Sequence, residues 1–179
     1  MGKREVKAVF LDRDGVLNKV SIRDGKACSP RSREEFVLSD GAPAAVAALR
    51  NAGFKVLVVT NQPDIARGEL AQADLDWMTE KLLSETSVDE VLVCPHDDHH
   101  ACSCRKPHPG MLMEGAKKWD IVLSQSYVIG DGWKDMGAGK RAGCSCILID
   151  TEYNRGVSAD GHASCLLDAV KHILRKEGM

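Results

Sequence analysis

The sequence has little of what would mark a membrane, secreted or nucleic-acid-binding protein. No apolar run reaches the roughly 20 residues of a membrane-spanning helix, so we expect no membrane partner. The start of the chain lacks the apolar segment of a signal peptide, which favours a cytoplasmic location. The 24 basic and 26 acidic residues give a net charge of −2 without a basic block, and aromatics make up only 4%. This composition argues against a nucleic-acid partner.

What is present is typical of one globular domain. The chain has 179 residues, of which 44% are hydrophobic and 28% charged. This length and composition predict a single domain over 1–179, without repeats or linkers. We expect it to act as a monomer.

Apolar segments and helical patterns alternate along the chain. The segments rich in Val, Ile and Leu predict five strands, at 6–11, 55–60, 89–94, 126–130 and 145–150. Helices are predicted at 42–52, 72–85, 109–119, 134–142 and 166–176. Near-continuous apolar strands are typical of a parallel sheet covered on both faces. The predicted fold is therefore α/β, a three-layer doubly wound parallel sheet. Two stretches, 19–36 and 95–108, have no assigned structure.

Polar side chains follow four of these segments, at the edge where an open α/β sheet binds its ligands. They are Asp12 and Asp14 after the first strand, Thr60 and Asn61 after the second, Arg105 and Lys106 after the third, and Asp131 and Asp135 after the fourth. An isolated Asp-x-Asp is usually a solvated turn. The whole set, in this order, indicates a site.

The chemistry of the set suits phosphoryl transfer. Mg²⁺ takes oxygen ligands and would offset the negative charge of the carboxylates toward an anionic substrate. Asp12 can attack phosphorus to form an aspartyl-phosphate, while Asp14 protonates the leaving alkoxide and then deprotonates water. Thr60 and Lys106 would donate to the phosphoryl oxygens.

Four motifs resemble those of the haloacid dehalogenase superfamily, and most of all its capless branch. They are Asp12-Arg-Asp14-Gly-Val, Val-Val-Thr60-Asn61-Gln62, Cys-Arg105-Lys106-Pro-His-Pro-Gly-Met and Ile-Gly-Asp131-x-x-x-Asp135, within 8–150. The resemblance implies a Rossmann-like core without a cap. It implies Asp12 as nucleophile, Asp14 as acid/base, and Mg²⁺ held by Asp12, the Asp14 carbonyl and Asp131, with Asp135 nearby. It also assigns Asn61 and Arg105 to the substrate.

Three cysteines and a histidine gather in one short loop, about 94–108. Cys94, His96, Cys102 and Cys104 have the composition of a closed structural Zn²⁺ site, and the resembled branch carries the same cluster. We expect zinc to fix the loop beside Arg105 and Lys106. The other four cysteines are most simply core fillers or free thiols. Within the loop, His99 and His100 are either solvated or support the metal, and His108 could touch the substrate.

The resemblance implies a phosphatase of a small phosphorylated metabolite. Within the branch, the sequence is more similar to enzymes that remove the 7-phosphate of D-glycero-D-manno-heptose 1,7-bisphosphate than to histidinol-phosphate phosphatases, which stay the alternative. Pro63-Asp64 departs from the Ser-Gly common in the heptose enzymes, and the region after Asn18 lacks their Gly-Tyr. Basic residues could bind a second anionic group or be solvated; they are Arg23, Lys26, Arg31 and Arg33.

Two functions of other classes stay open. A phosphometabolite-binding protein without turnover would show no hydrolysis across a broad panel of phosphate esters, and the intact Asp12/Asp14 pair argues against it. A phosphatase of nucleic-acid ends would need a basic surface, and its binding would depend strongly on salt.

Overall fold

A six-stranded parallel sheet forms the centre of the molecule, in the order β5-β4-β1-β6-β7-β8. In the computed structural model, which describes residues 5–179, its strands are β1 (Ala8–Leu11), β4 (Lys55–Asn61), β5 (Glu90–Cys94), β6 (Tyr127–Gly130), β7 (Ser145–Ile149) and β8 (Gly161–Ala163). The first four residues, part of the segment searched for a signal peptide, lie outside the described residues.

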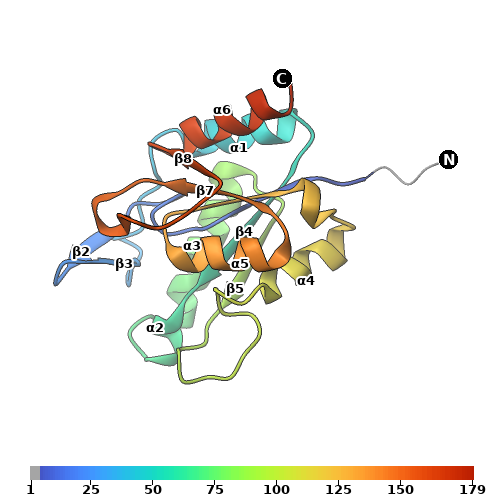
Figure 1. The fold of residues 1–179 in the computed structure, drawn as a ribbon. Coiled ribbons are helices and arrows are strands. Elements are labelled where there is room, and N and C mark those ends of the chain that lie inside the picture. Colours follow the sequence, from blue (N-terminus) through green and yellow to red (C-terminus); the bar gives the residue numbers. More distant parts are fainter. Residues whose placement is uncertain (1–4) are drawn as a thin grey trace.

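Helices cover both faces of the sheet (Figure 1). On one face lie α1 (Ala42–Asn51), α3 (Gln72–Thr86) and α6 (Leu166–Lys176), and on the other α4 (Gly110–Trp119) and α5 (Trp133–Ala142). Alternate residues of β1 point to opposite faces: Val9 and Leu11 pack with the first group, Ala8 and Phe10 with the second. The predicted three-layer α/β fold is therefore confirmed.

All five predicted strands are present, and several short elements were not predicted, among them the 3-10 helices η1 (Leu123–Gln125) and η2 (Glu152–Asn154). The edge strand β8 has only three residues, and α2 (Pro63–Ala66) has four. The unassigned stretch 19–36 contains an antiparallel hairpin of β2 (Ser21–Arg23) and β3 (Lys26–Cys28). The hairpin projects from the body of the molecule (Figure 1).

The ends of the strands place the predicted site residues. Strands β1, β4 and β6 are neighbours and run parallel, so the segments that follow them meet at one edge of the sheet. The connection from β1 to α1 carries the small hairpin in place of a cap domain. Within residues 5–179, none of the helices combines the length and apolar character that crossing a bilayer requires.

Candidate active site and metal loop

The turn after β1 carries the first two aspartates. The Asp12 N–H donates to the Ile129 carbonyl of β6 (2.9 Å), which extends the sheet pairing by one residue. Gly15 then reverses the chain with a positive φ of 81°. A Cβ at Gly15 would lie 1.9 Å from Oδ2 of Asp131, so any side chain there would collide with that carboxylate. Glycine thus lets the β1 and β6 segments approach closely.

Lys106 joins the two acidic segments through one buried ammonium group. Its Nζ lies 2.8 Å from Asp12 Oδ1 and 2.6 Å from Asp135 Oδ1, and it donates to the Val59 carbonyl (2.8 Å). Its backbone exchanges two hydrogen bonds with the Asn61 side chain, both 3.0 Å long. Burial alone would lower the pKa of Lys106, but the Asp12 and Asp135 carboxylates outweigh it and raise that pKa. The lysine therefore stays a fixed cation at neutral pH.

The third aspartate, Asp131, is oriented by residues from a segment after β7. The Tyr153 hydroxyl donates to Asp131 Oδ2 (2.5 Å), and the Asn154 amide donates to the Asp131 carbonyl (2.8 Å) and to the Ile149 carbonyl (2.7 Å). Neither Tyr153 nor Asn154 was predicted from the sequence. The only local signal was their place just after a predicted strand, because no motif marks them.

The Asp14 carboxylate is surrounded by nitrogen donors. It accepts hydrogen bonds from Arg13 (3.0 and 3.1 Å), Asn18 (3.0 Å) and Gln62 (2.8 Å). Burial would raise its pKa, but the Arg13 guanidinium and these hydrogen bonds outweigh burial and lower it. Asp14 is thus poised as a carboxylate, the form that accepts a proton. Sequence analysis had not assigned roles to Arg13, Asn18 or Gln62.

Three carboxylates form a set that fits a divalent cation. Oxygens of Asp12, Asp131 and Asp135 lie within 4.8 Å of one another. Burial, with repulsion from Asp135, raises the pKa of Asp12, and the same two causes raise the pKa of Asp131 to about 6. Crowded buried carboxylates that resist ionisation, all with oxygen donors, match what Mg²⁺ would stabilise. The Asp14 carboxylate does not join this set among the described residues.

These groups open into a cleft of about 370 Å³. Its lining includes Asp12, Asp14, Asn61, Arg105, Lys106, Asp131 and Asp135, so most predicted site residues face one space. Thr60 is the exception: it is buried, and its hydroxyl oxygen accepts a hydrogen bond from Gln62 (2.8 Å). Trp133 stands at the rim with 59% of its surface exposed.

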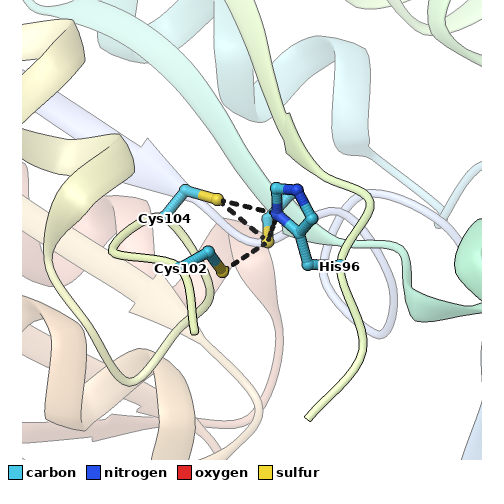
Figure 2. Close-up of side chains that lie close together, drawn as sticks. His96, Cys102 and Cys104 are labelled. Carbon is cyan, nitrogen blue, oxygen red and sulfur yellow. Dashed lines mark hydrogen bonds between the residues drawn. The ribbon is translucent and has the colours of Figure 1, made fainter. Parts of the chain in front are cut away.

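The four residues of the predicted zinc site also come together. Figure 2 shows His96, Cys102 and Cys104 pointing toward one another from two segments of the loop. The Cys94 Sγ lies 3.2 Å from the Cys104 Sγ and 3.9 Å from the Cys102 Sγ. The His96 Nδ1 lies 3.6 Å from Cys94 Sγ and 3.3 Å from Cys104 Sγ.

These separations, from 3.2 to 3.9 Å, lie close to the donor spacing of a tetrahedral metal site. Ligands about 2.0–2.3 Å from a central zinc ion stand roughly 3.5–3.8 Å apart along the edges of the tetrahedron. Burial is the largest cause of the raised pKa of Cys94, about 12. A bound cation would lower this pKa, because it stabilises the thiolate. The donor set fits Zn²⁺, with Nδ1 rather than Nε2 of His96 as the nitrogen ligand.

The metal loop holds Arg105 directly. The Arg105 guanidinium donates to the His96 carbonyl (3.0 Å) and to the Asp98 carboxylate (2.8 Å), so the arginine is linked to the loop at His96 and again two residues further along. His100 accepts a hydrogen bond from the Asp97 N–H (3.1 Å). His108 is not among the residues that line the cleft.

Three of the four basic residues proposed as a second anion site are paired with acidic side chains. Arg23 contacts Glu35, Arg31 contacts Asp64 and Glu69, and Arg33 contacts Asp74. This pairing favours the reading of a structural, solvated cluster over that of an anion site.

Comparisons with known proteins agree with this geometry. A family model described as a haloacid dehalogenase-like hydrolase matches residues 30–143. A protein of Bordetella bronchiseptica named D-glycero-beta-D-manno-heptose-1,7-bisphosphate 7-phosphatase is 35% identical over 161 residues, covering 87% of each chain. A Photorhabdus laumondii protein named as the corresponding alpha-heptose phosphatase is 32% identical, covering 86% of this chain and 87% of its own.

A solved structure is similar over nearly the whole chain. It is the D,D-heptose 1,7-bisphosphate phosphatase of B. bronchiseptica complexed with magnesium and phosphate, with a TM-score of 0.82 and 32% identity, covering 96% of this chain and 99% of that one. Family model, relatives and fold point the same way. The chain belongs to the haloacid dehalogenase-like hydrolase family.

Proposed function

We propose that the protein is a Mg²⁺-dependent phosphatase that removes the 7-phosphate of D-glycero-D-manno-heptose 1,7-bisphosphate. The observation that carries the chemistry is the cleft in which Lys106 bridges Asp12 and Asp135 beside Asp131. The names of the relatives support the substrate, and because they include both anomers, the anomer is a matter for assay. We further propose that the enzyme works in the cytoplasm as a monomer and carries zinc in the metal loop.

Asp12 is the nucleophile in this proposal. Its Oδ1 accepts hydrogen bonds from Lys106 Nζ (2.8 Å) and from the Arg13 N–H (2.7 Å), which fixes the carboxylate plane. We assign the attack to Oδ2: it forms a bond to phosphorus while the bond to the sugar oxygen breaks, leaving an aspartyl-phosphate and an alkoxide.

Asp14 moves the protons. Its protonated form donates to the leaving alkoxide, and the resulting carboxylate then takes a proton from the water that attacks the aspartyl-phosphate. That second step releases inorganic phosphate and restores Asp12. Arg13, Asn18 and Gln62 favour the carboxylate form, so they assist the second step.

The remaining charges serve the phosphoryl group. Lys106 supplies a fixed positive charge beside Asp12, where negative charge shifts between phosphoryl oxygens during transfer. Asp12, the Asp14 carbonyl and Asp131, with Asp135 nearby, would hold Mg²⁺, which would offset the negative charge of the carboxylates and supply Lewis-acid chemistry to the phosphoryl group. Asn61 lines the cleft and can contact the substrate there. It also acts indirectly, because its side chain holds the Lys106 backbone in place.

The substrate is tested by measuring phosphate release, with Mg²⁺ present, from both heptose 1,7-bisphosphate anomers and from histidinol phosphate. We expect kcat/KM to be highest for a heptose bisphosphate. A higher value for histidinol phosphate would transfer the assignment to the alternative. Equal low rates on all three would reject both substrates, and no hydrolysis of any phosphate ester would favour a binding protein.

The covalent route is tested with Asp12→Asn, which changes one carboxylate oxygen to an amide and should leave the fold intact. We expect kcat to fall roughly a thousandfold or more, as for other enzymes that lose their nucleophile. Circular dichroism and the melting temperature check the fold. Residual turnover of more than a few per cent would contradict an aspartyl-phosphate on this residue.

A further inference from the structure

Asp64, in the short helix α2, accepts hydrogen bonds from two arginines of different loops. Its carboxylate is only 10% exposed and receives Arg31 Nε on Oδ2 (2.8 Å) and an Arg67 guanidinium nitrogen on Oδ1 (3.3 Å). Its backbone carbonyl accepts the N–H groups of Glu69 and Leu70, which closes the turn after α2. One buried carboxylate thus has a fixed place between two cations.

Arg67 continues the connection to the metal loop. It grips the Asp97 carboxylate with two nitrogens, at 2.8 and 2.6 Å, and Asp97 follows the zinc-site residue His96. A two-point contact of this kind fixes orientation as well as distance. The metal loop lies beside α2 (Figure 1).

Arg31 continues the connection in the other direction. It lies two residues after Ser29, which lines the cleft together with Asp14. The loop that lines the cleft at Ser29 is thereby joined, through Arg31, Asp64 and Arg67, to the loop that carries Arg105.

Each arginine also has a second acidic partner. Glu69 contacts Arg31, and Asp97 holds Arg67. Loss of the Asp64 charge would therefore leave each arginine with one acidic partner, while it removes the charge that both arginines share. Asp64 is the one carboxylate of this network that contacts both arginines among the described residues.

We propose that Asp64 is a positioning residue that couples the metal loop to the 19–36 loop, so that retention of zinc and affinity for substrate both depend on it. It touches no reacting atom and acts through Arg31 and Arg67. The part of this inference that concerns substrate affinity rests on the proposed phosphatase function; the part that concerns zinc does not.

The test compares Asp64→Asn with Asp74→Asn in the zinc-loaded enzyme. Asp74 is a matched control, because it pairs with Arg33 of the same loop at 2.7 Å but belongs to α3 and does not lead to the metal loop. Two quantities are measured: the rate of zinc release to a colorimetric chelator, and kcat and KM for the heptose bisphosphate.

For Asp64→Asn we expect zinc release to accelerate roughly three- to tenfold, as for loss of a hydrogen bond to a charged partner, and KM to rise by a similar factor. The kcat should change less than twofold, because Asp12, Asp14 and Lys106 keep their contacts. Asp74→Asn should leave both quantities within twofold. A merely structural defect would instead lower kcat and thermal stability together, and would not raise KM while kcat stays nearly constant.

Arg31→Gln provides a second variant that cuts the same link at a half-exposed residue. We expect a rise in KM with a smaller effect on zinc release, because Arg67 keeps both of its carboxylates. If the enzyme is active and binds zinc but Asp64→Asn behaves like Asp74→Asn, the proposed coupling is wrong. It is also wrong if the protein binds no zinc. Absence of turnover in the unsubstituted enzyme would instead reject the proposed function and leave zinc release to decide the coupling.

Discussion

The hydroxyl of Tyr153 hydrogen-bonds Asp131, a proposed magnesium ligand. Its 2.5 Å hydrogen bond to Asp131 Oδ2 orients that carboxylate toward Asp12 and Asp135. Removing a partner that orients a metal ligand typically costs roughly 10- to 100-fold in metal affinity. We therefore expect Tyr153→Phe to raise the Mg²⁺ concentration for half-maximal activity by about tenfold or more. The measurement is a Mg²⁺ titration of phosphate release.

Tyr127→Phe is the control for this variant. It also removes a tyrosine hydroxyl that donates to a carboxylate, that of Glu177 (2.7 Å), but at the end of the C-terminal helix α6 rather than in the cleft. Its Mg²⁺ requirement should stay that of the unsubstituted enzyme. An unchanged titration curve for Tyr153→Phe would show that Asp131 needs no such support.

Among single residues, those that directly follow strands could be placed from the sequence. Asp12 and Asp131 end neighbouring parallel strands, so their meeting follows from the fold. The direction of a side chain does not follow in the same way. Asp14 faces Arg13, Asn18 and Gln62 because of a local turn. The Tyr153 contact comes from a single turn of 3-10 helix, Glu152–Asn154, which is too short to show a periodic pattern.

The metal loop is an element whose order we expect to depend on its ion. The Arg105 guanidinium is held by the carbonyl of His96, a proposed zinc ligand, and by Asp98, so we expect a loop without its ion to release that guanidinium from its place in the cleft. Cys102→Ser should therefore lower kcat/KM by roughly tenfold or more, since small displacements of positioning groups are costly. Metal analysis and steady-state kinetics on the same preparation measure both effects.

Cys165→Ser serves as the matched cysteine variant, because Cys165 is exposed and precedes α6, outside the metal loop. It should keep its zinc and its activity. Full activity in a zinc-free Cys102→Ser protein would show that the metal does not position Arg105 and Lys106.

The end of α6 is fastened to the sheet through Glu177. Its carboxylate accepts hydrogen bonds from Lys7 Nζ and from the Tyr127 hydroxyl, both 2.7 Å long. These hydrogen bonds, with the charge of Lys7, lower the pKa of Glu177 below its ordinary value of 4.5. Glu177→Gln keeps an acceptor for Tyr127 and removes the charge. We expect the free energy of unfolding at pH 7 to fall by about 0.5–1 kcal/mol, because Lys7 is partly exposed.

The pH dependence has a defined sign. A carboxyl whose pKa is lower in the folded state stabilises that state above its unfolded pKa of about 4.5, and this stabilisation is lost as pH falls through the lower, folded pKa. The difference between the two proteins should therefore be constant from pH 7 to 5 and shrink below about pH 4.5. Denaturant unfolding curves at several pH values measure it. A difference that grows on acidification would contradict the assignment.

Elements with long apolar patterns could be predicted, and short ones could not. Strand β4 has seven residues with an unbroken apolar run at 56–59, and its position was clear from the sequence. The three-residue β8 pairs with β7 only because the chain returns along that edge. The hairpin of β2 and β3 is mostly exposed and so lacks the apolar alternation that marks a half-buried strand.

For the whole molecule, the two faces of the sheet explain why one chain builds a complete site. Each face has its own apolar cluster, and strand β1 contributes alternate residues to both, which holds the carboxyl edge in one rigid frame. The alternation of apolar strand segments and helical patterns along the sequence therefore predicted the layers and the edge of the sheet that binds the ligand. The depth of the cleft and its rim depend on loops, which carry no such repeat.

Because one chain builds the site, we predict a monomer whose specific activity does not depend on protein concentration. Among the described residues, the large exposed apolar side chains lie on separate elements; they include Ile22, Leu83, Met113 and Trp133. Stable interfaces usually need a contiguous apolar patch. Sedimentation velocity at micromolar concentrations should therefore show one monomeric species, and specific activity should stay constant on hundredfold dilution. A dimer that loses activity on dilution would mean that a second copy completes the cleft, with exposed Trp133 at its rim as the first contact to test by substitution.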